Sequence, residues 1–174
     1  QYPVVDVMVE SLPNSSRPAL AVVINVRGRL VSLINVHLTP QLGRGRTREA
    51  ELGGVLELAN QLPEPVFIAG DFNFGDKARE NHLLSDMTDA FREIQPDAVG
   101  HTWNKKENPL ARKNSYAAEP SRRLDRILFS SDVIVVETAS IVLDEALEGG
   151  LFPSDHFGLV ARVALGPEAA DQAP

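Results

Sequence analysis

An apolar run that ends in Gly70, Asp71 and Asn73 is the stretch of this sequence most open to a chemical interpretation. The residues from Val66 to Ala69 are all apolar, which predicts a strand buried on both faces. A carboxylate and an amide at the end of such a strand lie where ligands bind in layered α/β folds. Burying two polar groups costs free energy unless they take part in binding or catalysis. The same residue types also build ordinary Asx turns, so this motif alone leaves both interpretations open.

Three further sites in the chain place polar side chains beside apolar runs. His37 ends the run 30–36, Asp125 lies near the start of the run that reaches Phe129, and Asp155 and His156 precede the last apolar run. Hydrolysis of a phosphodiester needs a carboxylate to align water, a metal ion, and hydrogen-bond donors to the anionic oxygens. The four sites together supply groups of each kind, which predicts hydrolytic phosphate chemistry.

Each of these side chains has a role that its chemistry allows. Asp155 can ligate Mg²⁺ (or Mn²⁺), and Asp71 can orient the attacking water or accept its proton. Asn73 and His37 can donate hydrogen bonds to phosphate oxygens. We therefore predict that these residues surround the scissile phosphorus.

His156 can also donate to a phosphate oxygen, as an imidazolium, if Asp125 pairs with its other ring nitrogen. For His82 and His101 no such partner is visible in the sequence, and a structural role is the simpler interpretation. The predicted catalytic set is therefore Asp71, Asn73, Asp125, His156 and His37.

The elements that must position these residues follow from the hydrophobic pattern. Apolar residues with helical spacing predict a helix over 47–62, with Thr47 as its cap, between the strands 30–36 and 66–69. This strand, helix and strand form a βαβ-like unit. We also expect strands over 4–9, 19–26, 124–129, 133–142 and after Phe157, a hairpin tip at 27–29, short helices over 79–84 and 88–94, and a long loop over 100–121.

Composition limits the class of protein. The chain has 174 residues, of which 43% are hydrophobic, which suits one domain over 1–165 followed by a flexible tail over 166–174. No apolar run approaches the ~18 residues that cross a membrane, so we expect a soluble protein with no membrane partner. The chain has no cysteine, which excludes disulfides and thiolate metal sites and favours an intracellular location.

The charge is acidic overall but unevenly distributed. A net charge of −7 argues against non-specific coating of nucleic acid. If the basic segments share one rim, they form a positive mouth for a phosphate-bearing ligand; ordinary solvated surface charge is the alternative. Ten of the 17 basic residues lie in two segments: Arg44, Arg46, Arg48, and then Lys105, Lys106, Arg112, Lys113, Arg122, Arg123 and Arg126.

The motifs occur in the order seen in the endonuclease/exonuclease/phosphatase superfamily, which this chain resembles from about residue 30 to residue 163. Within it, the sequence most resembles the type-2 tyrosyl-DNA phosphodiesterases. The motifs that carry the resemblance are His37-Leu38, Gly70-Asp71-Phe72-Asn73, Thr102-Trp103, Arg123-Leu124-Asp125-Arg126-Ile127 and Pro153-Ser154-Asp155-His156-Phe157.

The resemblance implies the fold, an α/β chain that forms part of a four-layered α/β sandwich of the DNase I-like type. It implies the roles assigned above and adds Trp103, at a position where the tyrosyl-DNA enzymes place an aromatic ring against nucleic acid. Stacking on such a ring contributes ~1–3 kcal/mol per base. The alternative for Trp103 is a half-buried core residue.

The sequence departs from the family pattern in two respects. The tyrosyl-DNA enzymes have an arginine where this chain has Gly75, and Arg44, Arg46 or Arg48 are candidates to replace it. The family also has an Asn and a metal-binding Glu in an earlier half of the domain, and neither motif precedes His37. The resemblance therefore implies a missing N-terminal portion, and we expect self-association or binding of that portion.

We therefore predict a Mg²⁺-dependent phosphodiesterase or nuclease that acts on nucleic-acid 5′ ends, as in DNA repair. A sphingomyelin- or inositol-type phosphodiesterase is an alternative with the same fold. A non-catalytic binding module is the alternative from a different class, because a metal ligand is missing.

Overall fold

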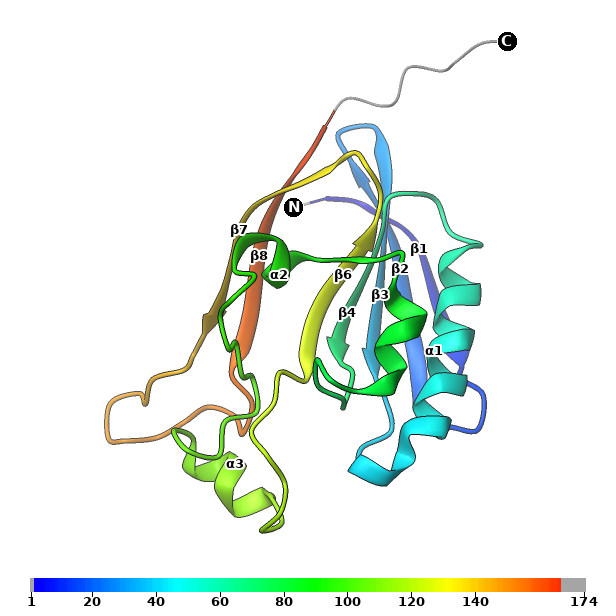
Figure 1. Ribbon diagram of the computed structural model, residues 1–174. Helices are drawn as coiled ribbons and strands as arrows, with labels where there is room; N and C mark the ends of the chain where they lie inside the picture. The colour runs from blue at the N-terminus through cyan, green and yellow to red at the C-terminus, as the bar shows by residue number, and fades with distance from the viewer. Residues whose placement is uncertain (1, 167–174) are drawn as a thin grey trace.

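The computed structural model describes residues 2–166 and centres on a mixed sheet of six strands, in the order β1-β2-β3-β4-β6-β5 (Figure 1). β7 and β8 pair separately as a two-stranded sheet. The strands are β1 (Val4–Ser11), β2 (Pro18–Val26), β3 (Arg29–His37), β4 (Val66–Asp71), β5 (Thr88–Asp89), β6 (Asp125–Ser130), β7 (Ile134–Val142) and β8 (Gly158–Leu165). The helices are α1 (Gly45–Ala59), α2 (Ala90–Ile94) and α3 (Pro109–Asn114), with 3₁₀ turns η1 (Leu42–Arg44) and η2 (Arg79–Leu84).

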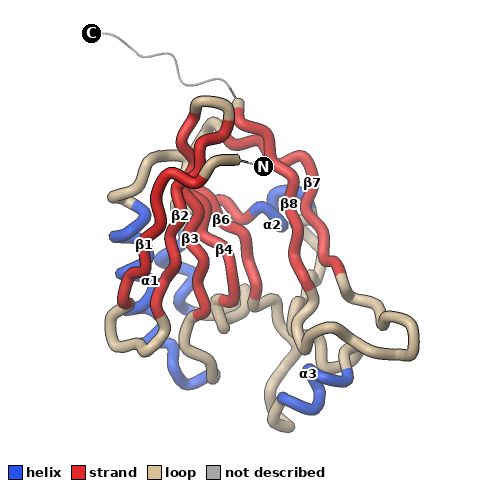
Figure 2. The backbone as a smooth tube through the Cα atoms, turned by 180° about the vertical axis from the view of Figure 1, so that it is seen from behind, coloured by secondary structure: helices blue, strands red, loops and turns tan. Residues whose placement is uncertain are grey.

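Both faces of the central sheet carry a hydrophobic core. On one face Ile68 of β4 packs in a cluster with Leu52 of α1, and on the other Phe67 packs in a cluster with Ile134 of β7. Figure 1 shows α1 to one side of the sheet and the β7–β8 pair to the other, and Figure 2 shows the same arrangement from behind. Successive residues of β4 therefore enter different cores, which explains why the run 66–69 is apolar throughout.

The predicted βαβ unit is confirmed, because β3 and β4 are parallel neighbours joined through α1. β4 passes β3 at Gly70, whose φ of 133° is rare for any residue with a side chain. A Cβ atom at Gly70 would lie 2.0 Å from the backbone oxygen of Val36. Glycine is therefore required where β3 and β4 deliver His37 and Asp71 to the same edge of the sheet.

Helix α1 begins earlier than the predicted 47–62 and is preceded by η1. Thr47 lies in its first turn and does not cap it, and the N-cap position is held by Arg44 without a side-chain hydrogen bond. The buried face includes Arg48 and Glu51. The first two helical residues are a glycine and an arginine, so a pattern based on apolar residues alone places the helix start too late.

Two other predicted segments contain more structure than expected. The short helix predicted over 88–94 is split into β5 and α2, and the Asp89 side chain caps α2 by accepting hydrogen bonds from the N–H groups of Phe91 and Arg92. The long loop predicted over 100–121 contains α3, which Asn108 caps in the same way. At the C-terminal end, Gly166 donates a hydrogen bond to Val133, and the rest of the predicted tail, 167–174, lies outside the described residues.

Part of the surface is apolar. Val5, Val7 and Val9 of the edge strand β1 are 56%, 56% and 68% exposed. Val7 pairs with Val22 of β2, and Val22 pairs in turn with Leu33 of β3, which is 38% exposed. An apolar strip therefore crosses three strands. Within residues 2–166, no helix combines the length and the apolar character that crossing a membrane requires.

Candidate active site

Strand register places three of the predicted site residues side by side. His37 at the end of β3 is the partner of Asp71 at the end of β4, and Asp71 is in turn the partner of Asp125 at the start of β6. The antiparallel direction of β6 is what allows its first residue to meet the last residue of β4. His37 lies 34 positions before Asp71 and Asp125 lies 54 positions after it, yet both are its direct neighbours in the sheet.

Asn73 holds the carboxylate of Asp71 in place. Its backbone N–H donates to Asp71 Oδ1 at 2.8 Å, and its side-chain Nδ2 donates to Asp71 Oδ2 at 3.0 Å and to the backbone oxygen of Leu38 at 2.8 Å. The left-handed backbone of Asn73, with φ of 56°, makes these contacts possible. Both Nδ2 hydrogens are donated within the protein, so this arrangement favours an orienting role over the predicted donation to phosphate.

His156 lies between two carboxylates. Its Nδ1 is 2.7 Å from Asp125 Oδ2, the pairing that the sequence predicted, and its Nε2 is 4.0 Å from Asp71 Oδ2. On the other side of Asp71, His37 Nε2 is 3.6 Å from the same Oδ2 atom. Two imidazoles therefore face one carboxylate oxygen, at distances that leave the oxygen open to a further partner.

These contacts shift the pKa values of both central groups. Burial raises the pKa of the Asp71 carboxyl above its ordinary value, and the charge of Asp125 raises it further, against the opposing effects of His156 and Asn73. Burial by itself would lower the pKa of His156, but the hydrogen bond and charge of Asp125 and the charge of Asp71 outweigh it, so the pKa is raised. Asp71 becomes a stronger base and His156 keeps its proton to higher pH.

Asp155 is oriented by two neighbours at the edge of the same site. Asn114 Nδ2 donates to its Oδ2 at 2.9 Å, and Ser154 Oγ lies 3.3 Å from its Oδ1. Burial would raise the pKa of Asp155, but the Asn114 hydrogen bond and the charge of His156 outweigh that effect and lower it. The carboxylate is therefore ionised at neutral pH, as a metal ligand must be.

The fit of a divalent cation is partial. Among residues 2–166 no group of three or more His, Asp or Glu side chains converges on one point that could hold a metal ion. Asp155 can contribute one oxygen, and Mg²⁺ commonly uses one or two carboxylates together with waters and substrate phosphate. The described residues alone do not complete a protein-ligated metal site.

Trp103 is buried more deeply than its predicted stacking role requires. Its side chain packs with Ala111 and Leu124, leaving the residue 7% exposed, and its Nε1 donates to Ser115 Oγ at 3.2 Å. The ring meets the His156 imidazole edge to face, with centroids 4.9 Å apart. In this position Trp103 supports His156 and offers little open surface to a base.

A cavity of about 560 Å³ joins the predicted residues. Its walls also include Arg17, Tyr116 and Glu119, which the sequence did not single out for this site. All the predicted site residues line it: His37, Asp71, Asn73, Trp103, Asp125, Asp155 and His156.

Thr102, which the sequence named only as part of a motif, and Asn108, which it did not single out, are structural supports of the site. Thr102 Oγ1 accepts hydrogen bonds from the N–H groups of Leu124 and Asp125, and its backbone oxygen accepts one from Phe157 at 2.7 Å. Asn108 Nδ2 donates to the backbone oxygen of Ser154 at 2.9 Å. Both residues are fully buried. A polar residue next to Trp103 was the available signal for Thr102; the contact of Asn108 spans 46 positions and has no local signal.

Buried polar residues of α1 fix the loop that follows His37. Glu51 accepts hydrogen bonds from the N–H of Thr39 at 2.9 Å and from its hydroxyl at 2.6 Å. Arg48 donates to the backbone oxygens of Thr39 and Gln41 and pairs with Glu80 at 2.7 Å. Arg48 is 2% exposed and paired, so it neither adds free charge to a positive mouth nor lies on the solvated surface, the two interpretations that the sequence left open.

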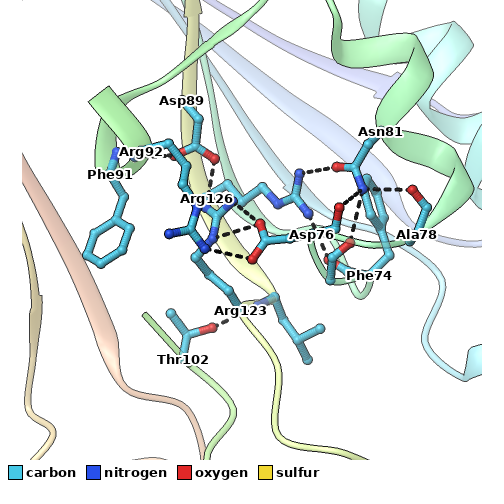
Figure 3. Close-up of polar contacts among 12 residues, drawn as sticks. Phe74, Asp76, Ala78, Asn81, Asp89, Phe91, Arg92, Thr102, Arg123 and Arg126 are labelled. Atoms are coloured by element: carbon cyan, nitrogen blue, oxygen red, sulfur yellow. Dashed lines mark hydrogen bonds and ion pairs between the residues drawn. The ribbon is translucent and has the colours of Figure 1, made fainter. Parts of the chain in front are cut away.

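Arg123 and Arg126 also point inward. Arg123 is paired with Asp76 and, at 2.7 Å, with Asp89 (Figure 3). Arg126 donates to Asn81 Oδ1 at 2.7 Å and to the backbone oxygen of Phe74 at 3.1 Å. Burial, together with repulsion from Arg123, lowers the pKa of Arg126 to about 10. These contacts tie the segment after Asn73 to β6 and the residues just before it, so neither a positive mouth nor solvated surface charge describes these two arginines.

Comparisons with known proteins agree with this fold. A sequence profile of the Endonuclease/Exonuclease/phosphatase family matches residues 1–156. The chain is 30% identical to human tyrosyl-DNA phosphodiesterase 2 over 158 residues, covering 86% of this chain and 43% of that protein. The Xenopus laevis protein of the same name is 29% identical over 154 residues, covering 83% and 40%. The chain thus spans less than half the length of these curated relatives.

Solved structures show the same fold. D. rerio TDP2 complexed with single strand DNA product matches with a TM-score of 0.80 at 21% identity, covering 94% of this chain and 68% of that chain. The human Nocturnin catalytic domain with bound sulfate anion matches with a TM-score of 0.73 at 21% identity, covering 94% and 60%. These matches confirm the predicted α/β fold class, and the curated relatives confirm the predicted resemblance. The profile match over residues 1–156 shows that this chain belongs to the Endonuclease/Exonuclease/phosphatase family.

Proposed function

We propose that this chain carries the catalytic centre of a phosphodiesterase that hydrolyses nucleic acid, at 5′ ends and with a preference like that of the tyrosyl-DNA phosphodiesterases. The observation that carries the proposal is the convergence of His37, Asp71, Asp125 and His156 on one cavity. Membership of a family of nucleases and phosphatases supports it, as do curated relatives named tyrosyl-DNA phosphodiesterase 2 and a similar structure that holds single-stranded DNA. Since the relatives are longer, the activity of the whole protein is part of the proposal.

The geometry supports an in-line attack of water on phosphorus. Asp71 accepts a proton from the attacking water or orients it, since its raised pKa makes it a better base than an ordinary aspartate. His156, protonated and held by Asp125, donates from Nε2 to a phosphate oxygen and stabilises the charge that develops there. His37 provides a second donor on the opposite side of Asp71.

A divalent cation, Mg²⁺ or Mn²⁺, is part of the proposal. Asp155 would supply one ligand, and phosphate oxygens and water would supply others. Bound there, the ion would neutralise phosphate charge. The test is Mg²⁺ binding that depends on Asp155, measured as a Mg²⁺-induced rise in melting temperature that Asp155→Asn abolishes.

The activity test compares a 5′-phosphotyrosyl oligonucleotide with a generic phosphodiester in the presence of Mg²⁺. We expect hydrolysis of the first by a chain that also includes upstream sequence of a full-length relative, and its loss in Asp71→Asn and His156→Ala. His82→Ala is the matched control, since His82 is exposed and lies outside the cavity. Equal hydrolysis of both substrates would contradict the 5′-end preference.

The pH dependence of the rate gives an independent check. Activity requires Asp71 ionised and His156 protonated. The rate should therefore rise with pH through the raised pKa of Asp71 and fall through the raised pKa of His156. A bell-shaped profile is the expected result, and a rate that does not fall above neutral pH would contradict the role of His156.

Binding without turnover is the second candidate function. The specific observation in its favour is that residues 2–166 contain no complete set of metal ligands. Under this alternative, 5′-phosphorylated oligonucleotides bind in the cavity but are not hydrolysed, with or without upstream sequence. The hydrolysis assay, run together with a measurement of oligonucleotide binding, separates the two functions.

A further inference from the structure

Arg126, the second residue of β6, is a cation at a position where the packing of the strand favours an apolar side chain. Side chains two residues apart in a strand share a face. Leu128 on that face belongs to the hydrophobic cluster of α1, and Arg126, at 4% exposed, is nearly as buried as Leu128 at 2%. A charge in such a place costs free energy unless ion pairs and hydrogen bonds compensate it.

The compensation for the charge of Arg126 is incomplete. Within residues 2–166 Arg126 forms no ion pair, and the two carboxylates that attract it, Asp76 and Asp89, are bound directly by Arg123. Its Nε atom is buried and has no hydrogen-bond partner among the described residues. A neutral side chain would avoid this cost, so the stability of the fold does not explain an arginine here. Departures of this kind are expected where a residue serves a functional site.

Arg126 anchors the residues on both sides of Asn73. Its guanidinium carbon lies 4.7 Å from the ring centroid of Phe74 and 5.8 Å from that of Phe72, and the two rings meet edge to face. One terminal nitrogen also donates to the backbone oxygen of Phe74 at 3.1 Å. A cation is attracted to the face of an aromatic ring. Both neighbours of Asn73 are therefore held in the core, while Asn73 itself lines the candidate active-site cavity.

The other terminal nitrogen of Arg126 anchors the rest of this segment through Asn81. It donates to Asn81 Oδ1 at 2.7 Å (Figure 3). Because a guanidinium can only donate, this contact fixes which end of the Asn81 amide faces Arg126. The Nδ2 end is then directed to three backbone oxygens, those of Gly75, Asp76 and Ala78, at 3.1, 2.9 and 2.7 Å.

The backbone of Asn73 depends on such anchoring. Its φ of 56° lies in the left-handed region, which costs free energy and persists only where surrounding contacts fix it. In this conformation the backbone N–H and the side chain of Asn73 both donate to the Asp71 carboxylate. Arg126 does not belong to the lining of the cavity. Any effect of Arg126 on a ligand must therefore pass through the segment that it anchors.

We propose that Arg126 is a positioning residue for the proposed reaction: by anchoring both neighbours of Asn73, it keeps Asn73 in the conformation that orients the Asp71 carboxylate. The inference rests on the proposed function and deepens it, because it names a residue that acts on Asp71 through Asn73 without touching the substrate. The planar fork of the guanidinium is required, since its two terminal nitrogens reach the Phe74 oxygen and Asn81 together.

The first measurement follows Asn73 itself by NMR and needs no activity. Its side-chain amide donates both hydrogens within the protein, so they should exchange slowly with water, and Asn73→Asp identifies their signals. Arg126→Met replaces the guanidinium by a neutral, flexible side chain. In this variant the exchange of the Asn73 amide should accelerate severalfold, while the backbone amides of β3 change little, because the segment opens locally.

Two further variants examine the anchors separately. Arg126→Lys keeps the charge without the fork, so its Asn73 exchange should lie between those of Arg126→Met and the unaltered chain. Asn81→Ala leaves Arg126 in place and removes one anchor, which gives a test even if Arg126→Met does not fold. It should accelerate the exchange of Asn73 by less than Arg126→Met does. A lysine that fully replaces Arg126, or an Asn81→Ala chain with unchanged Asn73 exchange, would contradict the proposal.

The controls separate positioning from general stability. Arg162→Met removes the same charge from an exposed position on β8, and Ile134→Val weakens the hydrophobic cluster on the opposite face of the sheet. In both controls the exchange of the Asn73 amide should change no more than that of the β3 backbone amides. If Arg126→Met accelerates Asn73 and β3 equally, Arg126 has only a general structural role and the proposal is overturned.

The second measurement is hydrolysis of the 5′-phosphotyrosyl oligonucleotide by the chain that includes upstream sequence. Arg126→Met should lower kcat and leave KM unchanged, because Arg126 does not contact the substrate and a displaced Asp71 slows the chemical step. The double variant Arg126→Met/Asn73→Ala should lose no more activity than Asn73→Ala alone, since Arg126 acts through Asn73. Losses that multiply in the double variant would refute this pathway.

The two measurements also separate this inference from the proposed function. If the unaltered chain hydrolyses neither substrate but Arg126→Met selectively accelerates the exchange of Asn73, the proposed function fails and Arg126 still holds Asn73. If the oligonucleotide is hydrolysed and Arg126→Met leaves the exchange of Asn73 unchanged, the proposed function stands and the positioning role fails.

Discussion

His156 is the residue whose protonation state connects the parts of this site. Asp125 contacts its Nδ1, Asp71 approaches its Nε2, and Trp103 packs against its ring. Each carboxylate stabilises the imidazolium, while burial opposes it. The charge on His156 therefore depends more on Asp125 than on any other neighbour.

Replacing Asp125 by asparagine tests this dependence directly. Asp125→Asn keeps a polar group near Nδ1 and removes the negative charge, so the pKa of His156 should fall toward or below the ordinary histidine value. The measurement is an NMR titration of the imidazole protons of the four histidines. Asp155→Asn, which removes the weaker carboxylate neighbour, should lower the pKa of His156 by less. An unchanged pKa in Asp125→Asn would show that the contact does not govern the charge.

At the same scale, the sequence predicted the site residues better than their supports. Asp71, Asp125 and His156 stand beside apolar runs, so local pattern identified them. The inward arginines could not be recognised, because the partners of Arg123 are 34 and 47 positions away along the chain. A basic residue in a predicted loop looks the same whether it faces solvent or a distant carboxylate.

Among the elements, β3, α1 and β4 determine where the chemistry is placed. The sequence predicted this unit because strand and helix periods are strong local signals. It did not predict that α1 reaches back through Arg48 and Glu51 to hold the loop after His37. Polar side chains on a buried helix face are satisfied only by tertiary contacts, which a periodic pattern does not contain.

Gly70 is the position in this unit where the backbone leaves no room for a side chain. Gly70→Ala should lower the free energy of unfolding by several kcal/mol, because the new Cβ would lie 2.0 Å from the Val36 oxygen at a φ of 133°. Gly53→Ala is the matched control, since nothing lies within 4 Å of its added Cβ inside α1. It should be neutral or stabilise by up to ~1 kcal/mol. Urea unfolding measures both, and equal stabilities would contradict the close approach of β3 and β4.

In the whole molecule, the sheet face opposite α1 is only partly covered. The β7–β8 pair packs over it at Phe67 and Phe129, while the strip through Val7 and Leu33 stays exposed. An exposed edge strand with apolar side chains favours pairing with another chain. The self-association expected from the sequence remains a prediction, and the strip gives it a location.

We therefore expect concentration-dependent association that lysines on the strip abolish. Val7→Lys/Leu33→Lys should sediment as a monomer where the unaltered chain associates, because burying two charges in the contact is unfavourable. Val99→Lys is the control, since Val99 is 66% exposed in a loop outside the strip. Sedimentation velocity over a range of concentrations measures the association state of each variant. An unaltered chain that stays monomeric throughout would contradict the expectation.

The alignment of His37, Asp71 and Asp125 across three strands has an evolutionary consequence. Side chains of a strand alternate between its two faces, so losing or gaining one residue within β4 would turn Asp71 away from both partners. The lengths of β3, β4 and β6 are therefore constrained more tightly than the identities of their apolar residues. Divergent descendants should keep the spacing inside these strands, while insertions and deletions should fall in the connecting segments, away from the residues that support the site.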